Sequence, residues 1–352
     1  MSLFWSEIVH KLVPYTPGEQ PVMCNLVKLN TNENPFAPAP EVLTAMKLAV
    51  NADLRLYPDP EAEHLKSTIA NYYGLQTDQI FVGNGSDEVL AHAFAAFFQG
   101  KTDLLMPDIT YSFYPVYCQL YQVQPKIIPL DQKFQINPAD YINAKAGIIL
   151  PNPNAPTGCL LSLNQIRQLL ETNPESLVLI DEAYIDFGGQ SATSLISHYP
   201  NLLVTQTLSK SRSLAGMRIG LAMGQAELIE GLQRVKNSFN SYPLDRIAQV
   251  AAIAAFKHES YFQQTCQQII QNRDELTNQL KNLGFEVLPS AANFVFARHR
   301  QLDAEMIYQH LYQQGVLVRY FNKPRINQFL RISIGTQIQQ HRLIEVLSEI
   351  VN

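Results

Sequence analysis

Short apolar segments alternate with helical segments between residues 79 and 223, and this alternation limits the fold more than any other feature of the sequence. Residues 177–180 (Leu-Val-Leu-Ile) are apolar without a break, as expected for a strand covered on both faces. The alternation is typical of an α/β fold with a mostly parallel sheet. Ligands of such sheets bind beyond the carboxyl ends of the strands, so the residues that follow each strand are candidates for a functional site.

Four of the predicted strands run directly into polar or glycine-rich segments. These segments contain Asp181, Asn154, Lys210 and the loop at residues 83–87. Beyond residue 223 the pattern changes to long helices followed by short strands, which predicts a smaller α+β domain beginning near residue 251.

Lys210 lies in the sequence Thr-Leu-Ser-Lys and is followed eight positions later by Arg218. A lysine amine that loses its proton can form a Schiff base with a carbonyl compound or with pyridoxal phosphate. Ser209 and Arg218 would suit the phosphate of such a cofactor, because arginine offers several donors in one plane. A Ser-Lys pair taken alone is more often an ordinary surface loop.

The loop at residues 83–88 places glycines between a strand and a helix. This arrangement binds phosphate through free backbone N–H groups and the helix dipole. It matches neither the P-loop nor the dinucleotide-binding glycine pattern. The alternative is a simple helix start in which Ser86 or Asp87 is the N-cap.

A pyridoxal phosphate site needs a lysine, a carboxylate for the pyridine nitrogen, donors for the ring hydroxyl and a site for the phosphate dianion. Asp181 follows four apolar residues and, as a buried carboxylate, requires a partner; an N-cap or an ion pair would also satisfy it. Asn154 and Tyr184 are candidates for the ring hydroxyl, and Tyr111 for stacking on the ring. The candidates for the dianion are Gly85, Ser86, Asp87, Ser209 and Arg218.

Seven motifs follow one another along the chain. They are N-E-N-P, Y-P-D, N-G-S-D-E, P-N-P-N-x-P-T-G, D-E-A-Y, T-L-S-K and L-R-I-S-x-G. Together they resemble the fold-type-I aminotransferases that depend on pyridoxal phosphate, and most closely the histidinol-phosphate aminotransferase family. The resemblance extends from Pro14 to Arg331.

The resemblance implies a large domain with a mostly parallel seven-stranded sheet and a smaller α+β domain. Residues 1–45 would form an N-terminal arm and part of the small domain, residues 46–250 the cofactor-binding domain, and residues 251–352 the small domain. It further implies a homodimer, because in the family the tyrosine of Y-P, here Tyr57, reaches the cofactor phosphate of the other subunit.

The resemblance also implies roles for the cofactor residues. Lys210 would bind the cofactor covalently and then move a proton between the substrate and the cofactor. Asp181 would pair with the pyridine nitrogen, Tyr184 would reach the ring hydroxyl and Tyr111 would cover the ring. The amides of Ser86 and Asp87, with Ser209 and Arg218, would hold the phosphate.

One position departs from the family pattern. Many members have asparagine directly before P-T-G as a ligand of the ring hydroxyl, whereas this chain has Ala155 there and Asn154 one position earlier. Either Asn154 takes over this role or the hydrogen bond is missing.

For the substrates, the resemblance implies that Arg331 meets the carboxylate of glutamate or 2-oxoglutarate and, with Arg319, the phosphate of histidinol phosphate. Tyr15 and Asn32 would line or close the site. The alternative for Arg319 is a surface ion pair.

Composition and charge argue against several other classes of protein. The net charge is -5 with both signs interspersed, so no basic surface for nucleic acid is predicted. The longest apolar runs, such as residues 250–256, are too short to span a membrane, and charged residues interrupt residues 1–11 too early for a signal peptide. The cysteines are scattered and suggest reduced thiols in a cytoplasmic protein, with no metal-binding pattern; they are Cys24, Cys118, Cys159 and Cys266.

Several functions stay open at this point. The first is transamination between L-histidinol phosphate and 2-oxoglutarate. The alternatives with the same cofactor are an aromatic amino acid aminotransferase and a decarboxylase of a phosphorylated amino acid. A regulator with an aminotransferase-like domain would need an additional DNA-binding segment, and a cofactor-free interaction protein would leave Lys210 and Asp181 unexplained.

Overall fold

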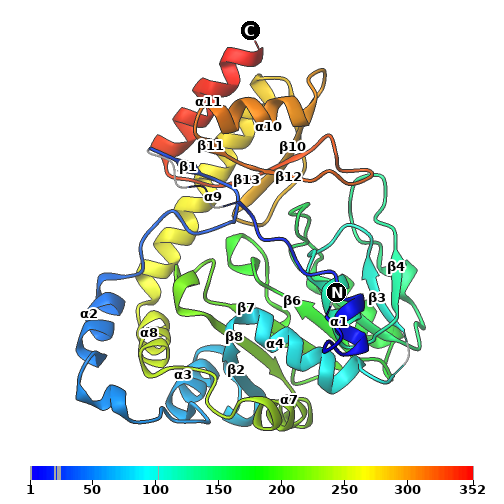
Figure 1. Cartoon of the computed structure of the whole chain (residues 1–352), viewed down its shortest axis with the longest axis vertical. Coiled ribbons are helices and arrows are strands. Elements are labelled where there is room, and N and C mark those ends of the chain that lie inside the picture. Colours follow the sequence, from blue (N-terminus) through cyan, green and yellow to red (C-terminus); the bar gives the residue numbers. More distant parts are fainter. Residues whose placement is uncertain (1, 20, 22–24, 102, 352) are drawn as a thin grey trace.

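The computed structural model describes residues 2–19, 21, 25–101 and 103–351, which form a large body and a small body joined by a long helix (Figure 1). The large body is built on a seven-stranded sheet. Strand β8 runs antiparallel to both its neighbours, and the other pairs are parallel. The predicted mostly parallel sheet is therefore confirmed. In spatial order the strands are β2 (Ile80–Asn84), β8 (Ile219–Gly224), β7 (Leu202–Thr207), β6 (Val178–Asp181), β5 (Gly147–Pro151), β3 (Leu104–Pro107) and β4 (Pro125–Ile128).

Helices cover both faces of this sheet, which explains the unbroken apolar strands. Alternate residues of β5 point to opposite cores: Ile148 and Leu150 to one, Ile149 to the other. The first core includes residues of α2 (Pro40–Ala49), α3 (Glu63–Tyr73), α6 (Leu163–Thr172) and α8 (Arg246–Lys257). The second includes residues of α4 (Gly85–Ala93), α5 (Tyr114–Leu120) and α7 (Ala226–Phe239).

The small body has its own sheet and its own apolar core. Its four antiparallel strands are, in order, β12 (Arg319–Tyr320), β13 (Leu330–Ser333), β10 (Phe294–His299) and β9 (Phe285–Val287). The helices that pack on this core are α9 (Glu259–Asn282), α10 (Ala304–Gln313) and α11 (Gln337–Val351). The boundaries expected at residues 45 and 250 stay a prediction.

A short strand from the N-terminal region joins the small body. β1 (Val27–Lys28) pairs in parallel with β11 (Val316–Leu317). The segment that follows β1 therefore starts beside the small body, and it continues toward α2 on the large body (Figure 1).

The remaining elements are short. They are α1 (Glu7–Lys11), the π-helical turn η3 (Phe94–Phe98), and the 3₁₀ turns η1 (Ala52–Arg55), η2 (Thr77–Gln79), η4 (Pro138–Tyr141), η5 (Ile185–Phe187), η6 (Ala192–Leu195) and η7 (Ala215–Met217). No helix within the described ranges has both the length and the apolar character needed to cross a membrane.

Helix α5 begins at Tyr114, where Pro115 occupies the first turn, a position in which its missing N–H costs no hydrogen bond. Strand β12 has two residues, too few to show an alternating pattern in the sequence. Gly74 closes α3 in the left-handed conformation that favours glycine.

Strand β8 lies unusually close to the start of α4, and a glycine makes this approach possible. A Cβ added to Gly220 would lie 2.4 Å from the backbone carbon of Gly85 and 2.4 Å from the backbone nitrogen of Ser86. No side-chain rearrangement can relieve a clash with backbone atoms. This contact fixes the glycine loop against the sheet.

We expect Gly220→Ala to destabilise the protein by about 1–3 kcal/mol or more, because the added methyl group forces the backbone of β8 and α4 apart. Urea unfolding followed by circular dichroism measures the change. Gly216→Ala is the matched control, since a Cβ there meets no atom within 4 Å, and its effect should stay within about 0.5 kcal/mol. Equal stability of the two variants would contradict the predicted role of Gly220.

Candidate active site

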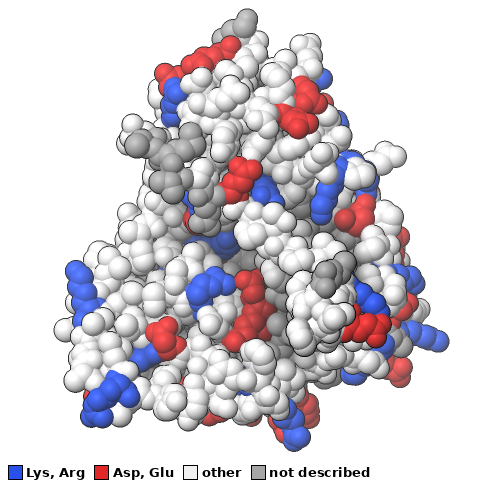
Figure 2. Space-filling view, viewed as in Figure 1, with Lys and Arg blue, Asp and Glu red and all other residues white. Residues whose placement is uncertain are grey.

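A cavity of about 260 Å³ opens beyond the carboxyl ends of the large sheet and beside the small body. The surface is hollowed between the two bodies, with basic side chains visible in the hollow (Figure 2). The predicted site residues that line the cavity are Tyr15, Asn32, Ser86, Asp87, Tyr111, Asp181, Tyr184, Ser209, Lys210, Arg218, Arg319 and Arg331. The chain thus brings together residues from its N-terminal region, its middle and its C-terminal region.

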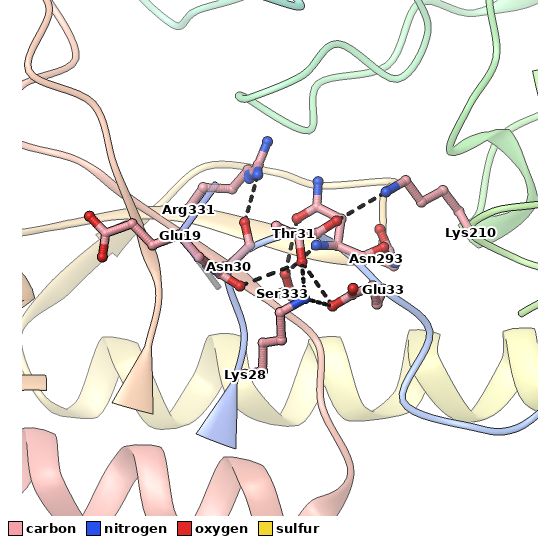
Figure 3. A network of polar contacts seen from close by, with 10 residues as sticks. Glu19, Lys28, Asn30, Thr31, Glu33, Lys210, Asn293, Arg331 and Ser333 are labelled. Atoms are coloured by element: carbon pink, nitrogen blue, oxygen red, sulfur yellow. Dashed lines mark hydrogen bonds and ion pairs between the residues drawn. The ribbon is translucent and has the colours of Figure 1, made fainter. Parts of the chain in front are cut away.

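Lys210 follows β7 and points at the N-terminal segment (Figure 3). Its Nζ donates to the backbone oxygen of Thr31 at 3.0 Å and lies 5.9 Å from the ring centroid of Tyr184. Burial, reinforced by the positive charge of Arg331, lowers the pKa of Lys210 to about 8. Roughly one tenth of this amine is therefore unprotonated at about pH 7, far more than for an ordinary lysine.

Asp181 ends β6 and is 4% exposed. Its Oδ2 accepts a hydrogen bond of 2.8 Å from the hydroxyl of Tyr114, and its Oδ1 has no hydrogen-bond partner among the described residues. Burial raises the pKa of Asp181 to about 6, and the Tyr114 hydroxyl opposes this rise most, followed by the Ala183 N–H and the Thr205 hydroxyl. A buried acceptor without a partner beside a cavity fits an N–H donor on a ligand.

Tyr184 is oriented by Asn32. The Nδ2 of Asn32 donates to the Tyr184 hydroxyl oxygen at 3.0 Å. Asn32 is itself held by Ser333 on β13, which accepts from the Asn32 backbone N–H at 2.9 Å and donates to Oδ1 at 3.0 Å. Because the Tyr184 oxygen accepts from Asn32, its own proton remains free for another acceptor.

The start of α4 and the side chain of Arg218 form a site suited to an anion. Helix α4 begins at Gly85, so the N–H groups of its first turn have no partner within the helix. Arg218 lies opposite and donates to Asp87 Oδ2 at 3.0 Å and to Ser209 Oγ at 3.5 Å. The other oxygen of Asp87 accepts from Tyr111 at 3.1 Å.

The alternative that Ser86 or Asp87 caps α4 is wrong. The N-cap is Asn84, and its side chain makes no capping hydrogen bond. Asp87 lies inside the first turn, where its negative charge favours the positive end of the helix dipole.

Two arginines form a second positively charged surface, on the small body. Arg319 and Arg331 are direct partners across the antiparallel strands β12 and β13. Like charges in this position repel unless an anion offsets them. Arg331 donates to the backbone oxygen of Asn30 at 2.9 Å, and its Nε, buried, has no partner in the described part of the chain. Burial also lowers the pKa of Arg331.

Three predicted residues do not line the cavity. Gly85 lies behind it, with the positive φ of 82° that favours glycine. Asn154 is 1% exposed, and its Nδ2 donates at 3.0 Å to both the Ile109 oxygen and the Thr157 hydroxyl, whereas Ala155 does line the cavity. Tyr57 is 79% exposed and stacks on Tyr242, with 4.8 Å between ring centroids.

Sequence reasoning missed two residues that support the site. Thr31 acts through its backbone oxygen, which no side-chain pattern reveals. Tyr114 belongs to none of the sequence motifs, and the hydrogen bond to Asp181 distinguishes it from other core tyrosines. Tyr15, predicted from the resemblance, lines the cavity and packs its ring 4.9 Å from that of Phe113.

The lowered pKa of Lys210 predicts its reactivity. Because only the neutral amine reacts, competitive acetylation of Lys210 in the ligand-free protein should reach half its maximum near pH 8 and level off above roughly pH 9. A lysine in a reference peptide, labelled in the same samples, should follow its pKa of about 10.4. Peptide mass spectrometry gives both profiles, and coincident profiles would contradict the prediction.

The chain matches the family described as "Aminotransferase class I and II" over residues 25–347. It is 61% identical over 350 residues to histidinol-phosphate aminotransferase 1 of Pseudomonas fluorescens (strain Pf-5), covering 99% of this chain and 100% of that protein. It is 59% identical over 351 residues to histidinol-phosphate aminotransferase 1 of Hydrogenovibrio crunogenus, covering 100% and 99%.

A solved structure has the same fold. The histidinol-phosphate aminotransferase from Sinorhizobium meliloti, in complex with pyridoxal-5'-phosphate, superposes with a TM-score of 0.87 at 24% identity, covering 100% of this chain and 98% of that one. The resemblance and the fold predicted from the sequence motifs are confirmed. The chain belongs to the class I and II aminotransferases and, within them, to the histidinol-phosphate aminotransferase family.

Proposed function

We propose that this protein is a pyridoxal-phosphate-dependent transaminase. It transfers the amino group of L-histidinol phosphate to 2-oxoglutarate and so produces imidazole acetol phosphate and L-glutamate for histidine biosynthesis. The observation that carries the proposal is a single cavity that holds the Lys210 amine, the partnerless oxygen of Asp181 and two separate anion-binding surfaces. The names of the relatives at 59–61% identity support the substrate.

The residues present fit pyridoxal phosphate. Asp181 Oδ1 would accept the ring N–H, and Arg218, Ser209 and the first amides of α4 would hold the phosphate. The Tyr184 hydroxyl would meet the ring hydroxyl, and Tyr111 would cover the ring. When bound, the cofactor supplies an aldehyde that takes up the amino group and a ring that accepts electron density.

Lys210 would serve as the proton carrier. Its amine would take the proton from the α-carbon of the amino donor and hold it at Nζ until it is returned to the product. A general base works best when its pKa lies near the operating pH, and burial brings the pKa of Lys210 to about 8. The Thr31 oxygen holds the amine at the N-terminal side of the cavity.

The arginine pair would accept both substrates in turn. Histidinol phosphate carries a phosphate ester and no carboxylate, whereas 2-oxoglutarate carries two carboxylates. Neighbouring guanidinium groups can meet either a phosphate or a carboxylate with charge-assisted hydrogen bonds. Tyr15 and Asn32 line the same region of the cavity.

The two alternatives with the same cofactor make different demands. An aromatic aminotransferase acts on donors without phosphate, so a second arginine would have no phosphate to bind. A decarboxylase of a phosphorylated amino acid would use both arginines but would need no 2-oxoglutarate. The high identity to proteins named as aminotransferases favours transamination.

Single amino donors distinguish these functions. Added to the purified enzyme with bound cofactor, L-histidinol phosphate should bleach the visible absorbance of the lysine-bound cofactor at far lower concentration than phenylalanine does. Arg319→Ala should raise the half-saturating concentration of histidinol phosphate roughly 10- to 100-fold, and that of glutamate less, because a charge-assisted hydrogen bond is lost.

Arg234→Ala is the control for Arg319→Ala, since Arg234 lies exposed on α7 and pairs with Glu230. Bleaching mainly by phenylalanine would make the protein an aromatic aminotransferase. Absence of bleaching by any donor would reject transamination. Equal losses for both donors in Arg319→Ala would show that Arg319 does not discriminate the phosphate.

We also propose that the protein is a homodimer in which Tyr57 reaches the partner's cofactor phosphate. Three side chains fix the loop of Tyr57 through its backbone oxygens: Arg246 to Tyr57 at 3.1 Å, Gln249 to Asp59 at 3.1 Å and Lys236 to Pro60 at 2.8 Å. The loop thus presents an ordered tyrosine outward. Apolar side chains just before it are also exposed, as at a protein interface; they are Leu48, Val50, Leu54 and Leu56.

Mixing two inactive variants tests this arrangement. Tyr57→Ala and Lys210→Ala should each lose most activity, but after subunits exchange, each heterodimer has one site with both residues intact. We expect the equimolar mixture to recover about one quarter of the wild-type activity in a twofold-symmetric dimer. If Tyr57 served the site of its own chain, both sites of the heterodimer would be defective and no activity would return.

A cytoplasmic location is part of the same proposal. Cys118, Cys159 and Cys266 are buried free thiols, which suits a reducing compartment. Cys24 lies outside the described residues.

A further inference from the structure

Tyr114 is the one core tyrosine whose hydroxyl bonds to Asp181 among the residues that the structure describes. It opens α5, is fully buried, and its ring lies edge-on to that of Tyr111 with 5.5 Å between centroids. Packing within the core of β3, α4 and α5 fixes the ring. The position of its hydroxyl is therefore set by the fold.

This hydroxyl makes a hydrogen bond that restrains the orientation of the Asp181 carboxylate, on which the Ala183 N–H and the Thr205 hydroxyl also act. The terminal torsion of an aspartate is broad, so a carboxylate without partners can rotate. In this chain Oδ2 is held at 2.8 Å by Tyr114, whereas Oδ1 is left without a partner beside the cavity. One oxygen is thereby anchored in the protein and the other is available to a ligand.

We propose that Tyr114 is a positioning residue, which anchors Oδ2 of Asp181 so that Oδ1 is presented to the ring nitrogen of the cofactor. The inference rests on the proposed function, since it needs pyridoxal phosphate in this cavity. Tyr114 does not line the cavity, so it acts on the cofactor through Asp181.

The hydrogen bond also affects the charge of Asp181. Burial raises the pKa of this carboxyl group to about 6, and the Tyr114 hydroxyl acts against the rise because it stabilises the carboxylate. Without the hydroxyl the pKa rises further, and less of the carboxylate is ionised at a given pH. The other charged or titratable groups around Asp181 are Asp87, Tyr117, Tyr184, Lys210 and Arg218.

Tyr114→Phe removes the hydroxyl and keeps the ring. Equilibrium dialysis of pyridoxal phosphate against the cofactor-free protein, repeated over a range of pH, measures the affinity. We expect the acid limb of the profile to move up by about one pH unit, so that affinity is roughly tenfold weaker at about pH 5 and only about twofold weaker at about pH 7. The shift is upward because cofactor binding requires the ionised carboxylate, whose pKa has risen.

Tyr141→Phe is the matched control. Tyr141 is as deeply buried, but its hydroxyl has no hydrogen-bond partner in the described chain, so its profile should match that of the wild type. In an Asp181→Asn background, Tyr114→Phe should cause no further shift of the acid limb, because the titrating group is gone.

The outcomes distinguish a failure of the proposed function from a failure of the proposed role of Tyr114. If the wild-type protein does not bind pyridoxal phosphate, the proposed function fails. If it binds and Tyr114→Phe leaves the profile unchanged, or weakens binding equally at every pH, Tyr114 only packs the core and the inference is wrong.

Discussion

The hydrogen bonds made by residues 30–34 connect the two bodies of the molecule, and the geometry of the cavity depends on them. On the small-body side, Asn30 accepts from Arg331, and Asn32 exchanges hydrogen bonds with Ser333. On the large-body side, Thr31 accepts from Lys210, and Asn34 donates to the Lys210 backbone oxygen at 3.0 Å. Figure 3 shows this segment between Arg331 and Lys210. One short piece of backbone thus holds both Arg331 of the small body and Lys210 of the large body by hydrogen bonds.

Several positively charged groups lie close together around the cavity, an arrangement that is electrostatically unfavourable without an anion. Arg319 opposes Arg331 across two strands, and Arg331 lies near enough to Lys210 to lower its pKa. Repulsion of this kind is unfavourable in the empty cavity and is offset when anions bind. The same burial that lowers the pKa of Lys210 raises that of Asp181. Opposite shifts of a base and an acid in one cavity are typical of a site that moves protons.

Much of this architecture could be predicted from the sequence, because unbroken apolar strands fix where a parallel sheet ends and hence where Asp181 and Lys210 meet. What could not be predicted depends on three-dimensional detail. The pairing of Arg319 with Arg331 follows from strand register, which the two residues of β12 do not reveal. The Thr31 contact uses a backbone oxygen, and the Tyr114 contact depends on where α5 begins. The motif at Asn154 allowed two outcomes, namely that Asn154 replaces the usual asparagine or that the hydrogen bond is missing. In the structure Ala155 faces the cavity and Asn154 does not.

At Ala155 the cavity wall lacks the side-chain amide that the family pattern has directly before P-T-G. Ala155 lines the cavity but has no polar side chain. The Nδ2 of Asn154 donates hydrogen bonds to the Ile109 oxygen and the Thr157 hydroxyl instead. Tyr184 then remains as the candidate partner for the ring hydroxyl of the cofactor. A tyrosine hydroxyl can rotate and donate its proton in more than one direction, unless a donor to its oxygen limits the choice. Asn32 engages it with a donor at 3.0 Å, so the Tyr184 proton must point elsewhere. Under the proposed function, Asn32 of the N-terminal segment thus orients the Tyr184 hydroxyl toward the cofactor ring. Tyr184 would make the contact that Ala155 of the proline-rich loop cannot make.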